Sequence, residues 1–406
     1  MEMIYVMDCF DDVETEEVHD GYFYKVSEVI KIIILGCLCG LKNTRQVHQW
    51  AASDRVREFL KEKFAIERVP CYYWMLCLLK MVKPESLSAC FTRWVHTFLP
   101  EYHEEEAEEK NQERNGLTVS FDGKTVRSTK KMKAYERPLH IVSAQLAELG
   151  LTFGQKAVEG KSNEIPAVRE LLKELDVRGC VVVADALNCQ EETAKEILKG
   201  GADYLLCVKG NQKNTRQPIA EYLRDESHKA EIDTVTREEK NRGRREKRTA
   251  YAMTNVAWFP GKKWPELACV GAIHREFEYG NKKTDEWHYY ISSRKLTAQE
   301  LLHRSRMEWS VESMHWILDV QFAEDNCRVE DDHVQRNLNI LRKLAINLVK
   351  LFKEKERLKK PLSHIMFDSL LEPSNLLNWT VENFPRWKML KECKSPAENE
   401  EKHQEK

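Results

Sequence analysis

The sequence predicts an α/β protein in which a mixed β-sheet carries helices on both faces, preceded by an all-helical module. Residues 24–97 repeat apolar side chains with the 3.6-residue period of amphipathic helices. Residues 117–210 instead alternate short apolar runs with amphipathic stretches. The acidic segment 101–116 between them has almost no large apolar side chain, which predicts a linker.

The helical module is predicted over residues 1–100. Its longest apolar run, residues 32–40, is shorter than the roughly 20 residues that span a bilayer. The acidic start of the chain is unlike a secretory signal. The twelve cysteines lie mostly in apolar runs and form no CxxC pair, which is typical of reduced core residues. These features predict a cytoplasmic protein without membrane contact.

A second domain is predicted over residues 117–360. Its first strands are expected at 117–123, 140–148 and 151–158, the last two joined by a tight turn at Leu149-Gly150. A helix at 164–175, a buried strand at 180–187, a helix at 189–201 and a buried strand at 203–210 follow. The resulting order, βββαβαβ, matches the ribonuclease-H-like topology.

The remaining pattern predicts a β-rich insertion and further helices. Segments of β type at 247–259, 267–278 and 287–294 place the insertion around 235–295. One helix is predicted over 297–322, and an amphipathic helix with a basic face over 334–356. Residues 361–406 are expected to be a C-terminal extension with a charged tail.

The formal net charge of −2 conceals a separation of charge along the chain. Residues 1–116 carry 14 basic and 21 acidic groups, residues 117–360 have a net charge of +7, and residues 361–406 carry 6 basic and 8 acidic groups. A positive excess confined to the middle of the chain is typical of a protein with a phosphate-bearing partner.

Two aspartates end predicted apolar strands, Asp122 in VSFDGKT and Asp185 in VVVADAL. The strand order brings both to the carboxyl edge, where open α/β sheets build their sites. Since apolar residues flank each carboxylate, it must pair or bind a cation. The alternative is that each aspartate only caps the turn that follows it.

A third carboxylate is expected on the helix 297–322. Glu308 and Glu312 lie one turn apart, near His315 and Trp316. Three carboxylates suit Mg²⁺ or Mn²⁺, which are hard ions that prefer oxygen ligands. The alternative is that Glu308 and Glu312 are ordinary solvated helix charges.

Four segments then carry a family resemblance: DGKTVRST, HIVSAQLAELGLTFGQKAVEGKSNEIPAV, VVVADALNCQEETAKEILKGGADYLLCVKGNQ and RMEWSVESMHWILDVQFAEDNCRV. In order and spacing, from about Asp122 to Asn347, the chain resembles bacterial DDE transposases of the ISAs type, including the H-repeat-associated proteins. The resemblance implies that Asp122, Asp185 and Glu312 are the DDE triad and bind two Mg²⁺ or Mn²⁺ ions. It also implies metal-dependent cleavage and strand transfer of an insertion sequence, with transposon ends and target DNA as partners and a homodimer in the DNA complex.

The chain departs from the family pattern at two places. Where the family usually reads HW-x-IEN-x-LHW, this chain has Glu308 and Ser313 in place of the His and Asn. Where it usually reads HGR, this chain has Arg242-Gly243-Arg244. Two alternatives therefore stay open: a degenerate or domesticated DNA-binding protein, and a metal-dependent nuclease without strand transfer.

Basic and amide side chains are expected to hold the DNA. Most of the candidates follow a proposed catalytic strand or belong to the basic segment 240–248, which is alternatively an ordinary solvated surface. The predicted DNA contacts are Lys124, Arg127, Lys209, Asn211, Gln212, Arg242, Arg244, Arg245, Arg248 and Arg306.

Overall fold

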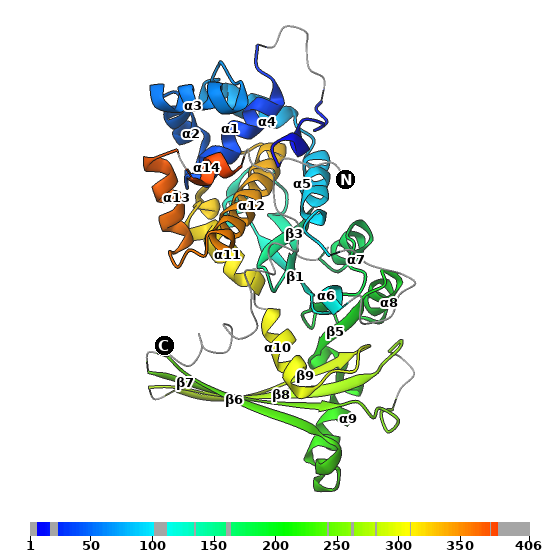
Figure 1. Ribbon diagram of the computed structural model, residues 1–406. Coiled ribbons are helices and arrows are strands. Elements are labelled where there is room, and N and C mark those ends of the chain that lie inside the picture. The colour runs from blue at the N-terminus through cyan, green and yellow to red at the C-terminus, as the bar shows by residue number, and fades with distance from the viewer. Residues whose placement is uncertain are drawn as a thin grey trace.

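The computed structural model describes residues 6–16, 23–100, 112–133, 135–159, 164–241, 243–260, 264–280, 282–308, 310–373 and 375–380. N-terminal helices pack on a long helix, which in turn packs on a single large sheet (Figure 1). This arrangement confirms the predicted fold class, a helical N-terminal region followed by a ribonuclease-H-like mixed sheet with helices.

The N-terminal helices are η1 (Asp8–Phe10), α1 (Val26–Leu38), α2 (Thr44–Ala51), α3 (Asp54–Phe64), α4 (Tyr72–Met81) and α5 (Pro84–His96). The side chain of Asn43 caps α2 by accepting a hydrogen bond from the Gln46 amide, and Pro84 starts α5 where no amide donor is needed. Helix α1 is buried almost throughout from Val29 to Leu38, because α2, α4 and the long helix α12 (Asp332–Lys355) surround it.

The nine strands form one sheet. They are β1 (Thr118–Thr125), β2 (Leu139–Leu146), β3 (Leu151–Glu159), β4 (Val181–Ala184), β5 (Asp203–Val208), β6 (Asp233–Asn241), β7 (Arg244–Met253), β8 (Cys269–Tyr279) and β9 (Lys282–Ser292). Their order is β3-β2-β1-β4-β5-β9-β8-β7-β6, in which β1, β4 and β5 are parallel to one another. The β-rich segment extends the main sheet, because β9 pairs with β5. Strand β6 was not predicted, since its sequence DTVTREEKN is almost entirely polar.

Helices cover both faces of the central strands. In β4, Val181 and Val183 pack in the cluster beneath α10 (Ala298–Met307), while Val182 and Ala184 join the main core on the other face. Burial on both faces explains why these strands are continuous apolar runs. The remaining helices around the sheet are α7 (Glu164–Glu174), α8 (Glu191–Lys199), α9 (Lys213–Arg224) and α11 (Ser310–Val320), with 3₁₀ turns η2 (Arg127–Lys131), η4 (Gly210–Gln212), η5 (Glu226–Glu231) and η6 (Glu324–Asn326).

The prediction of one helix over 297–322 was wrong, because the segment forms two helices, α10 and α11. The apolar side chains of α10, Leu301 and Leu302, pack beneath the central strands, whereas those of α11, Met314 and Leu318, join the main core. At 3.6 residues per turn these two sets would lie on roughly opposite sides of one continuous helix. A break between them allows both sets to be buried.

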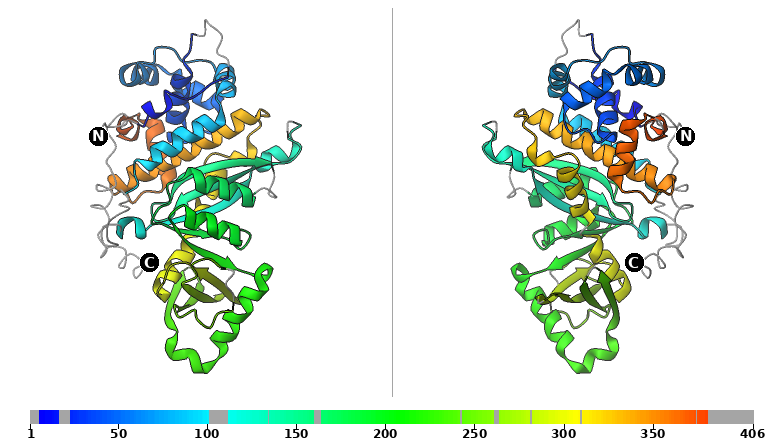
Figure 2. Two further views of the ribbon diagram at one scale, coloured as in Figure 1. Left: turned by 90° about the vertical axis from the view of Figure 1, so that its right-hand side faces the viewer. Right: turned by 90° about the vertical axis from the view of Figure 1, so that its left-hand side faces the viewer.

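The prediction of a basic face on α12 was also wrong. Its cations Arg342 and Lys343 are buried, and the helix lies between the N-terminal helices and the sheet (Figure 2). Helices α13 (Leu362–Leu371) and α14 (Asn375–Trp379) pack against it. The N-terminal module and the sheet therefore share one hydrophobic core through α12.

The predicted linker is described only at its end. Residues 112–115 form the short helix α6 (Gln112–Asn115), and residues 101–111 lie outside the described part of the chain. Arg114 is buried, donating to the carbonyl of Pro100 at 2.6 Å and to the carboxylate of Asp176 at 2.8 Å. This end of the segment is thus fixed to the sheet domain. Among the described helices, none is long and apolar enough to cross a membrane.

Candidate active site

Asp122 and Asp185 lie side by side at the carboxyl edge of the sheet. Strand β1 pairs in parallel with β4, with Phe121 opposite Ala184, so the next residues of the two strands are the two aspartates. This is the position expected from the strand order, since parallel neighbours end at the same edge. Both side chains are partly exposed.

Two more carboxylates approach Asp122. Burial, together with the negative charges of Glu164, Asp185 and Glu312, raises the pKa of Asp122 to about 6, although a hydrogen bond from the Gly123 backbone opposes this shift. Glu312 lies in the first turn of α11 and is exposed. The structure therefore brings the three predicted triad residues together, and it adds Glu164.

Glu308 belongs to the same acidic cluster. It follows the last turn of α10, and burial raises its pKa to about 7. Asp185, Asp122 and Glu312 raise that pKa as well, while the ammonium group of Lys209 lowers it. Glu308 stands where the family usually has histidine. It thus faces the triad and is not an ordinary solvated charge.

The loop after β4 holds Asp185 in place. Its Oδ1 accepts hydrogen bonds from the amides of Leu187 at 3.1 Å and Asn188 at 3.2 Å, and from Asn188 Nδ2 at 3.1 Å. Asp185 therefore does cap the turn that follows it, as the alternative interpretation held. Only one oxygen of its carboxylate, Oδ1, accepts these hydrogen bonds. The predicted DNA contacts Asn211 and Gln212 donate to the carbonyls of Ala186 and Cys189, so they brace this loop.

A buried network behind the aspartates escaped the sequence analysis. Glu164 receives hydrogen bonds from His140 Nε2 at 3.1 Å and from Asn188 Nδ2 at 3.4 Å. A Cβ atom on Gly123 would lie 2.2 Å from His140 Nε2 and 2.6 Å from Glu164 Oε2, so only glycine fits beside Asp122. The available signal was Glu164 itself, an acid within the family signature GKSNEIPAV at the start of a helix.

Replacing Asn188 by Ala should remove the link between Asp185 and Glu164. Asn188 is fully buried, so we expect a loss of about 1–3 kcal/mol in the free energy of unfolding. Misplacing the Asp185 carboxylate should also slow strand cleavage about 10- to 100-fold. Urea unfolding and single-turnover cleavage would measure the two effects. Asn214→Ala, at an exposed position of α9, is the matched control; an unchanged cleavage rate in Asn188→Ala would contradict the proposed positioning.

His315 of α11 lies beside Asp122, with Nδ1 3.5 Å from Oδ2. Burial, together with the positive charges of Lys343 and Lys124, lowers the pKa of His315 to about 3. The imidazole is therefore neutral at physiological pH and leaves the negative charge of the cluster uncompensated.

Known protein families match both the sheet domain and the N-terminal helices. The family described as "Transposase DDE domain" matches residues 114–348. The chain belongs to this transposase family. The associated family, DDE_Tnp_1-associated, matches residues 7–95, the helical N-terminal region.

Several curated proteins are similar to this transposase-family chain. The protein YbfL and the H repeat-associated putative transposase YhhI, both from Escherichia coli K12, are each 29% identical over 81% of this chain and 87% of their own length. A putative transposase YncI from E. coli O157:H7 is 32% identical over 58% of this chain and 62% of its own length. A piggyBac transposase in a synaptic complex with hairpin DNA is similar at a TM-score of 0.41 and 11% identity, over 93% of this chain and 78% of that chain.

Lys124 of the transposase domain has an internal role in place of the predicted DNA contact. Its ammonium group lies 2.5 Å from Asp319 Oδ1 and 2.9 Å from Glu324 Oε2, and its side chain is only 12% exposed. Two carboxylates thus neutralise this cation and hold β1 against α11 and η6. The ammonium group of Lys124 therefore faces these two acids and not the solvent.

The other predicted contacts next to the acids remain at the surface. Lys209 is exposed and close enough to Glu308 to lower its pKa. Arg127 is 77% exposed, although its amide and guanidinium both approach the carboxylate of Asp325. Among the described residues, Lys209 is thus a predicted cation that lies close to the acidic cluster and forms no salt bridge.

The basic segment 240–248 is largely neutralised by acids of the neighbouring strands. Arg245 pairs with Glu238 at 3.2 Å, and Arg306 of α10 pairs with Glu239. Arg244, Arg248 and Arg275 all surround Glu246. Arg242 lies outside the described residues. This pattern agrees better with a solvated, internally paired surface than with a free DNA-binding strip.

The donor atoms of the acidic cluster fit a hard divalent cation. In the parts of the chain that are described, no three His, Cys, Asp or Glu side chains form a ready-made metal cage. The donors beside Asp122 are nevertheless mostly carboxylate oxygens, joined by the neutral imidazole of His315, and the mutual repulsion of the carboxylates would be relieved by positive charge. Mg²⁺ keeps several waters and needs only one or two protein carboxylates. An open cluster of this kind is therefore compatible with it.

The raised pKa of Glu308 predicts a pH-dependent gain in stability for Glu308→Gln. Because the folded protein holds this proton up to about pH 7 and the unfolded chain only up to about 4.5, Glu308 destabilises the fold increasingly as the pH rises through that window. In EDTA, Glu308→Gln should raise Tm by about 1–4 °C at pH 8 and by much less at pH 5. Glu58→Gln on α3 is the exposed control, and an equal shift at both pH values would contradict the assignment.

Proposed function

We propose that this protein is a DDE transposase that cuts and joins DNA strands at the ends of an insertion sequence in the presence of Mg²⁺ or Mn²⁺. The observation that supports this most strongly is the convergence of Asp122, Asp185 and Glu312 at one edge of the sheet. Three solvent-accessible carboxylates at one edge of the sheet suit phosphoryl transfer assisted by divalent metal.

In this proposal each acid has its own part. Asp122 and Asp185 would hold one divalent ion, and Glu312 would help to hold the second. Bound divalent ions supply Lewis acidity at the scissile phosphate and stabilise charge on the entering and leaving oxygens. Asn188 fixes the orientation of Asp185, and Lys209 offsets phosphate charge beside the acids.

The test is an assay with labelled terminal inverted repeats and a target duplex in Mg²⁺. Joined product supports the transposase, cleaved product alone indicates a metal-dependent nuclease, and binding alone indicates a degenerate or domesticated DNA-binding protein. We further propose that two copies act together, since joining needs two ends. Mass photometry with and without end DNA would show whether a dimer forms.

A further inference from the structure

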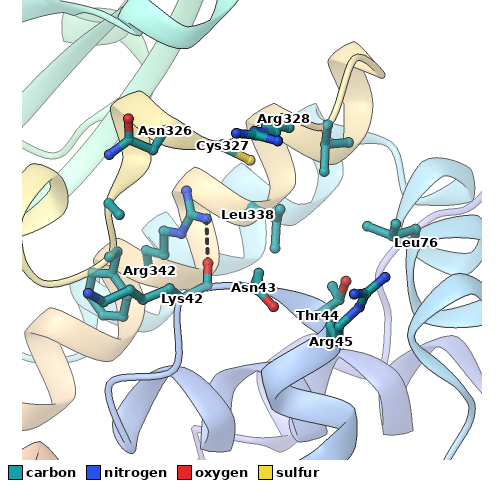
Figure 3. A pocket seen from close by; sticks show the side chains of 13 residues that line it. Lys42, Asn43, Thr44, Arg45, Leu76, Asn326, Cys327, Arg328, Leu338 and Arg342 are labelled. Carbon is teal, nitrogen blue, oxygen red and sulfur yellow. Dashed lines mark hydrogen bonds between the residues drawn. The ribbon is translucent and has the colours of Figure 1, made fainter.

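A cationic pocket of about 620 Å³ opens between the N-terminal helices and the connection from α11 to α12 (Figure 3). Its lining contains four cationic side chains and no Asp or Glu, and the rest is neutral. The four cations of this pocket are Lys42, Arg45, Arg328 and Arg342. An excess of positive charge inside one concave site is an anion-binding feature.

The pocket is built from three parts of the chain that lie far apart in the sequence. Lys42 and Arg45 flank the first residue of α2, whose positive helix end adds to the field. Figure 3 shows Arg45 on one wall and Arg328 on the opposite wall, with Leu338 of α12 between them. Cations therefore enclose the opening from both sides.

Arg342 forms the buried part of the pocket. Its side chain is 3% exposed, and Nη2 donates to the backbone carbonyl of Lys42 at 3.2 Å. Nη1 lies 3.6 Å from Glu324 Oε1, which is an ion pair beyond hydrogen-bond length, and it is buried without a hydrogen-bond partner. A fixed guanidinium group thus adds buried positive charge to the wall of the pocket.

The exposed cations of this pocket differ from those of strand β7. Lys42 and Arg328 make no ion pair within the described residues, and Arg45 lies 4.9 Å above the ring of Tyr72. The arginines of β7, in contrast, pair with acids of β6 or of β7 itself. The pocket therefore offers exposed positive charge that no acid of the described residues neutralises, whereas the arginines of β7 are paired.

We propose that this pocket binds a backbone phosphate of the DNA that the candidate active site acts on, an inference that rests on the proposed function. Glu324 contacts both Arg342 and Lys124, which is two residues after Asp122, so a short chain of contacts joins the pocket to the acids. Three of the four cations are exposed and only Arg342 is buried. An open arrangement of this kind suits a phosphate group of a DNA strand that reaches the pocket from solvent. It suits an enclosed free ion less well.

The test is the salt dependence of DNA binding by Lys42→Gln/Arg328→Gln. Each lost phosphate contact lowers the magnitude of the slope of log K against log salt by about 0.9, so the double variant should lose about 1–2. Its affinity for a labelled terminal-repeat duplex at 0.1 M NaCl should fall about tenfold or more. The control Arg57→Gln/Lys61→Gln makes the same change in net charge at exposed positions of α3 and should keep the wild-type slope.

Three outcomes would overturn the proposal. These are an unchanged slope in the pocket variant, an equal loss in the control, and calorimetric binding of inorganic phosphate that the variant abolishes while DNA binding stays intact. A failure of the proposed function would look different. The wild-type protein would bind DNA with a salt slope that depends on the pocket, but it would not cut the DNA in Mg²⁺. Cleavage by the wild type together with an unchanged slope would reject the pocket alone.

Discussion

Replacing Asp122, Asp185 or Glu312 by the corresponding amide should reduce Mg²⁺-dependent strand cleavage roughly a thousandfold or more. Each change keeps the shape of the side chain and removes one negative charge from the cluster that holds the divalent ions and, through them, the phosphate. Cleavage of a labelled terminal repeat under single-turnover conditions would measure the loss. DNA affinity in EDTA should stay equal or rise, because the acids repel the backbone rather than bind it.

The same variants should not unfold the protein. In the metal-free state the amide removes repulsion that raises the pKa of Asp122, so Tm in EDTA at pH 8 should be equal to or above that of the wild type. Glu58→Gln, on exposed α3, should retain full cleavage. Persistent cleavage by any one of the three folded variants would remove that residue from the triad.

Replacing Glu324 by Ala should be the most destabilising single change, with a loss of about 3–5 kcal/mol in the free energy of unfolding. Glu324 is buried and contacts Lys124 at 2.9 Å, Asn339 at 2.7 Å and Arg342 at 3.6 Å. Without Glu324, the buried Arg342 has no carboxylate within 4 Å in the described structure. Lys124 then has Asp319 as its single acidic partner among the described residues. Urea unfolding at pH 7 would measure the loss.

The sign of the pH dependence gives an independent check on this ion pair. Burial alone would raise the pKa of Glu324, but the charges of Lys124 and Arg342 lower it below the usual 4.5. Its stabilising contribution is therefore complete at pH values well above 4.5 and is lost only as acidification protonates the folded form. The control Glu62→Gln, in an exposed pair with Lys63, should lower the free energy of unfolding by less than about 1 kcal/mol. An equally small loss in Glu324→Ala would show that the buried pair contributes little.

The meeting of Asp122 and Asp185 could be predicted because each ends an apolar strand, and parallel neighbours end at one edge. The network of Glu164, His140 and Asn188 could not be predicted in the same way. Its members come from α7, β2 and the loop after β4, and nothing in their local sequence states that they share a hydrogen bond. Local sequence also could not show that 297–322 forms two helices. The break between α10 and α11 allows their apolar side chains to pack in two separate hydrophobic clusters.

The sequence by itself determined most of the order of strands and helices and the two aspartate-ended strands, because these follow from local periodicity, which each segment carries alone. The family followed from the resemblance of four segments. Only the tertiary structure decided which charges remain free. Lys124 is two residues from Asp122 but is neutralised by Asp319, 195 residues away, whereas Lys42 of the acidic N-terminal module joins Arg328 at a cationic pocket. The partner of a charge is set by packing between distant segments, and a count of charges along the chain cannot show it.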